Sequence, residues 1–182
     1  MTLSKALLPT QTLATRALMV LGGSIFIALA ARISVPMFPV PMTLSTLAVL
    51  LIGLSMGWRL GLATVGAYIA EAAAGLPVLA AGSVLGGPTT GFILGYLPMV
   101  ALAGLAADLG ARRFVPALVA SVAASLLIYV PGVLWLDAVT ALSFSGAIEK
   151  GMLPFVAGDM VKSVLAALAV AGGWAAISAK RG

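Results

Sequence analysis

Two residues of opposite charge stand inside one apolar stretch near the C-terminal end of the chain. Asp159 and Lys162 lie three residues apart, so a helix would place both side chains on the same face. Charges within an apolar spanning segment are costly, and they commonly mark a ligand site or an ion path. The alternative is a structural pair in which each charge only neutralises the other, although a buried pair stabilises a bundle poorly. We therefore favour a ligand site.

Glu71 is a third charge within an apolar stretch, close to the end of that stretch at Gly75. It either lines the same site or faces water at the level of the lipid headgroups. The segment that carries Asp159 begins near Met152, which puts Asp159 about 10 Å below that end of a helix. The three charges then lie in the outer half of the membrane. This arrangement predicts a polar cavity that opens to the outside.

Gly87, Gly91 and Gly95 recur at every fourth position. This spacing usually lets two helices approach closely. In a second interpretation, segment 87–91 presents backbone N–H groups and hydroxyls, such as that of Thr89, to a ligand at a helix N-terminus. Both interpretations can hold, on opposite sides of the segment.

The other residue types of the chain limit the kinds of chemistry that it could perform. Tyr96, like Tyr68 and Tyr129, falls in an apolar stretch and could stack on an apolar ligand ring, although such residues more often belong to the core. The chain has no histidine and no cysteine. It therefore lacks the commonest general base, the commonest metal ligand and any thiolate. The phosphate-binding pattern GxxxxGK[ST] is also missing. We expect neither an enzyme, nor a metal site, nor a cofactor.

The composition shows which solvent surrounds these residues. Hydrophobic residues make up 62% of the chain and charged residues 8%, and the mean hydropathy is +1.20. Such a chain must be surrounded largely by lipid. In lipid, only helices and closed barrels can satisfy all of their own backbone hydrogen bonds. The strands of a barrel alternate apolar and polar residues. Stretches 44–56 and 114–130 are apolar on all sides, so the fold class is all-α, a polytopic membrane protein.

A spanning helix needs about 20 predominantly apolar residues. Six segments meet or approach that length, and we expect six transmembrane helices in one integral membrane domain covering residues 1–182. The second and third segments are separated by Gly57, Trp58 and Arg59, so two short joined helices are favoured over a long one. The expected helices cover residues 17–33, 42–56, 60–75, 89–107, 114–135 and 152–177.

Positive residues indicate the orientation of the helices, because cytoplasmic loops carry an excess of Lys and Arg. With a cytoplasmic N-terminus, only Arg32 and Lys150 fall at outer ends. The inner cations are Lys5, Arg16, Arg59, Arg112, Arg113, Lys180 and Arg181. We therefore expect both termini in the cytoplasm and a multi-pass protein of the cell (inner) membrane. Cations scattered at segment ends are typical of topology signals, so nucleic acid is not an expected partner.

Two of the expected outer connections differ from ordinary polar loops. Segment 34–42 contains three prolines, which prevent helix formation and favour an extended path. Segment 76–88 is apolar, yet glycines and prolines interrupt it. Irregular apolar backbone at a membrane is tolerated where protein buries it or where it lines a cavity. We expect both segments to fold back over the bundle and to close over a ligand.

Three short motifs occur in order along the chain: VPMTL at 40–44, GLPV at 75–78 and GPTTGF at 87–92. Together with the Asp159-x-x-Lys162 pair, they make the chain, from about residue 22 onward, similar to the BioY family. Members of that family are biotin-specific substrate-binding S components of energy-coupling factor (ECF) transporters. The chain departs from the family pattern at Ser45, where Gln is expected, and at Thr90 and Phe92, so individual polar contacts to the ligand can differ.

The resemblance implies a six-helix fold that holds biotin near the outer surface. It also implies an energy-coupling membrane subunit and two ABC-type ATPases as partners, although some members are encoded without them. In the family, a small-residue surface of the first helix faces the energy-coupling subunit; here that surface includes Ala28 and Ala31. Packing within the chain is an equal alternative for these alanines.

Biotin offers a ureido ring, an apolar thioether ring and a carboxylate tail. Asp159 can accept hydrogen bonds from the ureido N–H groups, while hydroxyls donate to the ureido carbonyl. The candidate hydroxyls are those of Thr43, Ser83 and Thr89.

The carboxylate tail needs a cation, and Lys162 or Arg32 could supply it. An alternative places Lys162 on the ureido oxygen. Two other functions remain open: an S component for another small vitamin, such as thiamine or riboflavin, and a membrane scaffold without a ligand. Aromatic residues make up 7% of the chain, which is few for the cage that riboflavin needs.

Overall fold

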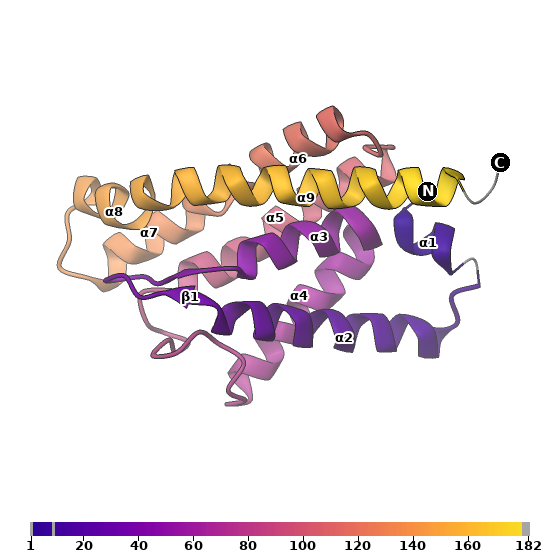
Figure 1. The fold of residues 1–182 in the computed structure, drawn as a ribbon. Coiled ribbons are helices and arrows are strands. Elements are labelled where there is room, and N and C mark those ends of the chain that lie inside the picture. The colour runs from indigo at the N-terminus through magenta and orange to yellow at the C-terminus, as the bar shows by residue number, and fades with distance from the viewer. Residues whose placement is uncertain (1, 9, 180–182) are drawn as a thin grey trace.

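A bundle of helices forms the whole molecule, as a computed structural model shows for residues 2–8 and 10–179 (Figure 1). The elements in chain order are α1 (Leu3–Leu7), α2 (Leu13–Arg32), β1 (Ser34–Val35), β2 (Met42–Thr43), α3 (Ser45–Met56), α4 (Trp58–Ala73), α5 (Thr90–Asp108), α6 (Phe114–Leu127), α7 (Tyr129–Val139), α8 (Phe144–Gly151) and α9 (Leu153–Ala179). The mostly helical class expected from the sequence is confirmed. The small antiparallel pairing of β1 with β2, which sets Ser34 opposite Thr43, corrects the all-α expectation in detail.

Long apolar helices account for most of the chain. Within the described residues, four helical stretches are long and apolar enough to cross a membrane: Leu13–Arg32, Thr90–Asp108, Phe114–Val139 and Phe144–Ala179. The third and fourth stretches combine α6 with α7 and α8 with α9. Helix α3 is apolar but has only 12 residues, and α4 has 16. The chain is a membrane protein in which two helices are shorter than a usual span.

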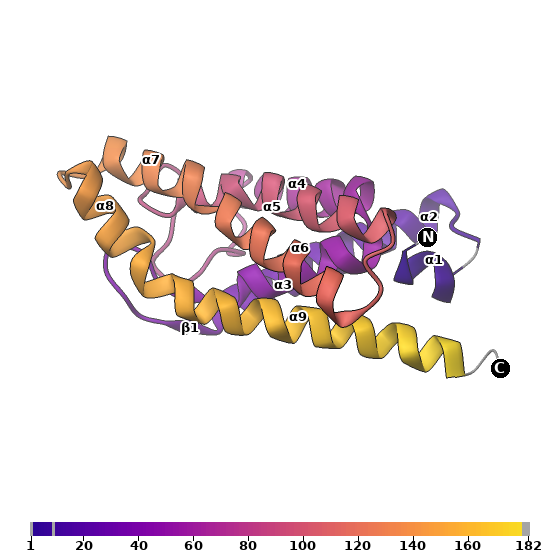
Figure 2. The same cartoon turned by 90° about the horizontal axis from the view of Figure 1, so that it is seen from above.

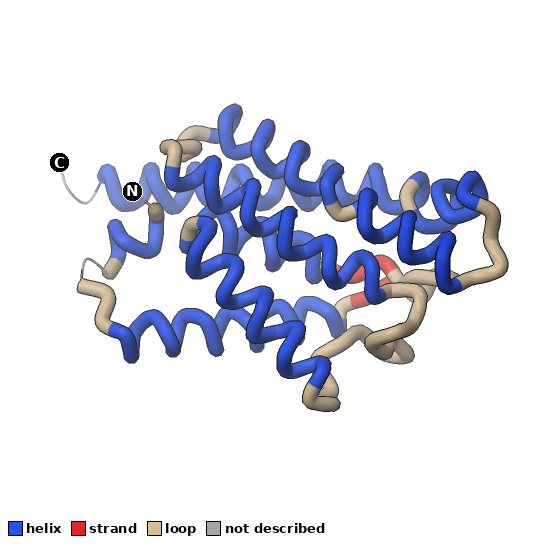
Figure 3. The backbone as a smooth tube through the Cα atoms, turned by 180° about the vertical axis from the view of Figure 1, so that it is seen from behind, coloured by secondary structure: helices blue, strands red, loops and turns tan. Residues whose placement is uncertain are grey.

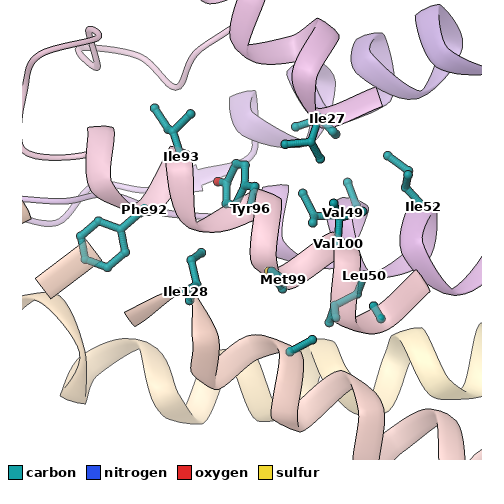
Figure 4. Packing of buried hydrophobic residues seen from close by; sticks show 14 of the residues in the cluster. Ile27, Val49, Leu50, Ile52, Phe92, Ile93, Tyr96, Met99, Val100 and Ile128 are labelled. Atoms are coloured by element: carbon teal, nitrogen blue, oxygen red, sulfur yellow. The ribbon is translucent and has the colours of Figure 1, made fainter. Parts of the chain in front are cut away.

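Helix α5 lies at the centre of the bundle and packs against α3, α4, α6 and α7. Figure 4 shows its side chains, including Met99 and Val100, among residues of α2, α3 and the α6–α7 junction. Both of these side chains are fully buried. The central position of α5 brings residues from distant parts of the sequence to one core.

Glycines on α5 allow this close packing. A Cβ atom added at Gly91 would lie 2.3 Å from the Cβ of Trp135, and one added at Gly95 would lie 2.9 Å from the carbonyl oxygen of Ile128. The close-packing interpretation of the glycine run therefore holds for these two residues. Gly87 precedes the helix and belongs to the connection before it.

The irregular segments gather at one end of the bundle. Figures 1 and 2 show α8, the β1–β2 connection and the loop after α4 at the end opposite to the described ends of the chain. The rear view in Figure 3 shows the two strands beside the tan loops at that same end. These segments lie where the sequence analysis expected folded-back connections. They form one end of the cavity described next.

Side chains hold the long α4–α5 connection in place. Trp135 Nε1 donates to the carbonyl oxygen of Gly87 at 3.0 Å, and the Gly86 N–H donates to Thr90 Oγ1 at 2.8 Å. The Arg32 guanidinium donates to the carbonyl oxygen of Pro77. This connection is apolar, yet its path is fixed because side chains of α2, α5 and α7 each bind its backbone.

Candidate binding site: a polar cavity under the loops

A small cavity of about 60 Å³ lies between the helices, at the end of the bundle where the loops gather. Its walls come from all three regions that the sequence analysis singled out: the segment around residues 40–46, the α4–α5 connection and helix α9. A cavity needs about 10–15 Å³ of such space to hold one water, so this one has room for several. Of the expected site residues, it is lined by Thr43, Ser83, Thr89, Tyr96, Asp159 and Lys162.

The charged pair lies inside the cavity wall. Lys162 Nζ lies 3.0 Å from Asp159 Oδ1, and the two residues are 7% and 3% exposed. Across residues 2–8 and 10–179 this is the only ion pair. Helix α9 places both side chains on one face, as the three-residue spacing predicted. The structure thus buries two opposite charges in the wall of the cavity.

Two further side chains complete the polar cluster. Tyr129, from the start of α7, donates its hydroxyl to Asp159 Oδ2 at 2.6 Å. Thr46 of α3 donates to Asp159 Oδ1 at 3.1 Å and accepts from Lys162 Nζ at 2.9 Å. Hydrogen bonds to charged groups are among the stronger ones in proteins, and connected networks reinforce one another. Three elements are therefore joined at this cluster.

Thr46 was not predicted as a site residue, and Tyr129 was expected only as a possible stacking residue. Both are polar side chains within apolar helices, and that was the signal that could have identified them. Thr46 lies in the first turn of α3, close in sequence to Thr43 of β2, and both line the cavity. A polar residue in such a stretch needs a partner, and here the partner is Asp159.

The cluster retains capacity for a ligand. An ammonium group has three donors, and Lys162 uses two of them, on Thr46 and Asp159. Thr89 Oγ1 is buried in the cavity wall and has no hydrogen-bond partner among the described residues. Buried hydroxyls normally have a partner. A polar ligand atom or a water molecule in the cavity would supply one.

Aromatic and aliphatic groups form the rest of the wall. The rings of Tyr68 and Tyr96 have centroids 6.4 Å apart, and the rings of Phe92 and Phe155 are separated by the same distance. Both pairs line the cavity. The Tyr96 side chain also interacts with Ser45 and Thr43. An apolar wall with a few clustered polar groups is the usual form of a site for a small organic ligand.

Two expected site residues lie elsewhere. Glu71 accepts a hydrogen bond from Ser24 Oγ of α2 at 2.7 Å, between α2 and α4 and outside the cavity wall. Arg32 is exposed, and its guanidinium is directed to Pro77 on the outer side of the α4–α5 connection. Sequence position placed these residues near the ends of their helices but did not give the direction in which they point.

Of the two alanines expected at a partner surface, Ala31 needs correction. Ala31 is 2% exposed and lines the cavity, and Ala28 is half-buried against the core. The small side chain of Ala31 thus contributes to the cavity wall. The outward face of α2 consists of other, larger residues, among them Leu21, Ile25 and Leu29.

Comparisons with known proteins identify the family of this chain. The sequence matches the BioY family over residues 4–179. A relative from Rhodobacter capsulatus named biotin transporter BioY is 37% identical over 169 residues, which cover 81% of this chain and 86% of the relative. A protein of the same name from Thermotoga maritima is 36% identical over 146 residues, covering 78% of this chain and 85% of that one.

A solved structure has a similar fold. It is the crystal structure at 2.1 Å of an S-component for biotin from an ECF-type ABC transporter, and it superposes with a TM-score of 0.74 at 22% sequence identity. The superposition covers 90% of this chain and 94% of the other. The family match spans nearly the whole chain, the named relatives are transporters, and the fold agrees. This membrane protein belongs to the BioY family.

Proposed function

We propose that this chain captures biotin in the cavity around Asp159 and Lys162, as the substrate-binding subunit of a biotin uptake transporter. The observation that carries the proposal is the buried charged cluster, which is set in an apolar wall and covered by two loops. The relatives named as biotin transporters supply the identity of the ligand. A structural pair alone would need neither a cavity nor an unpaired hydroxyl beside it.

The chemistry of the cluster suits the polar groups of biotin. Each carboxylate oxygen can accept two hydrogen bonds. Asp159 Oδ1 already accepts from Thr46 and Lys162, whereas Oδ2 accepts only from Tyr129. Oδ2 can therefore take one ureido N–H. The remaining donor of Lys162 and the free hydroxyl of Thr89 can each bind an oxygen of the ligand.

Thr43, Ser83 and Tyr96 line the same cavity and are proposed as further contacts. We propose a structural role for Glu71 and Arg32, because their hydrogen-bond partners belong to α2 and to the α4–α5 connection. We propose that they hold these elements around the site. The carboxylate tail of biotin would then rely on Lys162 or on hydroxyls rather than on Arg32.

We further propose a single domain of six membrane segments with both termini in the cytoplasm. Helix α3, helix α4 and the combined α6–α7 and α8–α9 stretches would be four of them. Figure 1 shows α1, the starts of α2 and α4 and the α5–α6 connection toward the end that carries the described ends of the chain. These elements carry five described cations: Lys5, Arg16, Arg59, Arg112 and Arg113. Arg32 and Lys150 lie toward the cavity end, and Lys180 and Arg181 are outside the described residues. This asymmetry supports a cavity that opens to the outside of the cell membrane.

The proposed partners are an energy-coupling membrane subunit and two ABC-type ATPases. The chain itself has no phosphate-binding GxxxxGK[ST] motif. Energy for release would therefore come from outside this chain. The exposed apolar face of α2, rather than Ala28 or Ala31, is the surface of the first long helix that remains available for such a contact.

Biotin should bind to the purified chain saturably and with no need for ATP or metal. The reason is that every group proposed to contact the ligand is a side chain already in place. Equilibrium dialysis against labelled biotin, with and without ATP and a chelator, tests this expectation. Thiamine and riboflavin serve as comparators. A scaffold would retain none of the three, and an S component for another vitamin would retain a different one.

The two loops should close further when biotin binds. Val40 and Pro41 of one loop and Leu79 and Ser83 of the other line the cavity, so both loops form part of its wall. Closure would exclude water and strengthen the hydrogen bonds beneath. A cysteine at Ser83 should be labelled from outside by an impermeant maleimide, and saturating biotin should slow the labelling. The chain has no other cysteine, so the label is specific.

Ser145→Cys is the matched control for this experiment. Ser145 is exposed on α8 at the same end of the bundle and does not line the cavity. Its labelling rate should not change with biotin. Equal rates at Ser83 with and without biotin would contradict loop closure. Labelling of both positions only from the cytoplasmic side would contradict the orientation.

A further inference from the structure

A basic pocket lies at the end of the bundle opposite to the polar cavity. It is formed by α1, the start of α2, the α3–α4 junction and the end of α5, and it has a volume of about 340 Å³. Lys5, Arg16 and Arg59 line it together with a single carboxylate, that of Asp108. Figure 1 shows α1 and the start of α2 at the end that carries the described ends of the chain.

The carboxylate in this pocket already has a structural role. Asp108 Oδ2 accepts from the backbone N–H of Trp58 at 3.3 Å, at the start of α4. Its two oxygens also lie 2.8 and 3.0 Å from where a Cβ would stand on Gly57. Asp108 thus joins the end of α5 to the α3–α4 turn. It can balance at most one of the three positive charges.

The cations themselves have no acidic partner. Among the residues that the structure describes, no ion pair joins Lys5, Arg16 or Arg59 to a carboxylate. The Arg59 guanidinium lies 5.2 Å from the centre of the Trp58 ring, which orients it beside the pocket. The Gln11 side-chain nitrogen, also in the pocket wall, is shielded from solvent and has no hydrogen-bond partner in the part of the chain that the structure describes. The pocket therefore presents excess positive charge and an unused donor.

We infer that this pocket binds the phosphodiester headgroup of an anionic phospholipid. Arginine and lysine bind phosphate oxygens well, and basic pockets between helices on the cytoplasmic side of a membrane attract anionic lipid headgroups. The same segment of chain exposes Leu7, Leu8 and Leu13, at 62%, 45% and 85%. Acyl chains attached to the headgroup would have an apolar surface beside it. A free phosphate would gain nothing from these leucines.

Lipid titration of the delipidated full-length protein tests the inference. Binding of phosphatidylglycerol and of phosphatidylcholine is measured in mixed micelles by tryptophan fluorescence and by Tm. The wild type should bind phosphatidylglycerol and not phosphatidylcholine. Replacing Arg16 and Arg59 together with Gln should weaken that binding by on the order of tenfold to thirtyfold. In the charge-conserving double variant Arg16→Lys and Arg59→Lys, the affinity for phosphatidylglycerol should stay within about twofold of the wild-type value.

Arg112→Gln with Arg113→Gln is the matched control, because it removes two cations near the same end but outside this pocket. Equal weakening in the control would overturn the inference in favour of general surface charge. Equal binding of the two lipids would overturn it, as would displacement of the lipid by inorganic phosphate alone. Biotin binding, at the other end of the bundle, should be unchanged in all variants and shows that each is folded. A negative result in this lipid experiment would therefore not contradict the proposed biotin site.

Discussion

Replacing Asp159 with Asn is expected to weaken biotin binding by about 1.5–3 kcal/mol, the usual effect of losing a hydrogen bond to a charged group. This range corresponds to roughly a tenfold to more than a hundredfold rise in Kd. The amide keeps the shape of the carboxylate but carries no charge. It leaves the ammonium of Lys162 buried without its counter-charge, and its NH₂ group cannot accept from Tyr129 or Thr46. Lys162→Ala should weaken binding by a similar amount, because it leaves the carboxylate of Asp159 buried without its counter-charge.

Affinity and Tm must be measured on the same sample, because the pair also joins α3, α7 and α9. A purely structural pair would lower the Tm and leave the affinity of the folded fraction unchanged, which would contradict the binding role. Asp137→Asn provides a control of the same chemistry. Asp137 is half-buried on α7 and does not line the cavity, so neither quantity should change appreciably.

The largest expected effect on stability comes from Gly104→Ala. A Cβ at this position would lie 2.4 Å from the backbone nitrogen of Trp58 and 2.5 Å from its Cα. These are backbone atoms of the α3–α4 junction and cannot move aside as a flexible side chain can. Overpacking of this kind destabilises by about 3 kcal/mol. The Tm should fall by roughly 6–12 °C, at about 2–4 °C per kcal/mol.

Gly66→Ala is the matched control, since Gly66 lies within α4 and its Cβ would meet no atom within 4 Å. Alanine favours a helix over glycine by about 1 kcal/mol. The Tm of this variant should therefore stay the same or rise slightly. A Gly104→Ala variant as stable as Gly66→Ala would show that α5 and the α3–α4 junction are not packed as closely as described.

The positions of the main helices could be predicted because the apolar stretches are long and turn residues separate them. The break between α6 and α7 was not predicted, because the stretch from Phe114 to Val139 is predominantly apolar and long enough for one span. Pro131 lacks an N–H group and disfavours the hydrogen bond that would continue α6. Helix α1 was also missed, because five residues give no periodic pattern to detect.

The polar cluster could be predicted only in part. Asp159 and Lys162 lie on one helix, so their spacing was enough to bring them together. Their contacts with Thr46 and Tyr129 span 113 and 30 positions of sequence and depend on how α3 and α7 pack against α9. The same limitation explains Glu71, Arg32 and Ala31. Helical depth follows from counting residues, whereas the direction of a side chain follows from tertiary packing.

A structure of the chain determined with saturating biotin tests the central proposal most directly. The proposed function predicts biotin in the cavity, with a ureido or carboxylate atom within hydrogen-bonding distance of Asp159 or Lys162 and the two loops over it. Biotin bound elsewhere, or a cavity that holds only water while biotin is retained by the protein, would contradict it.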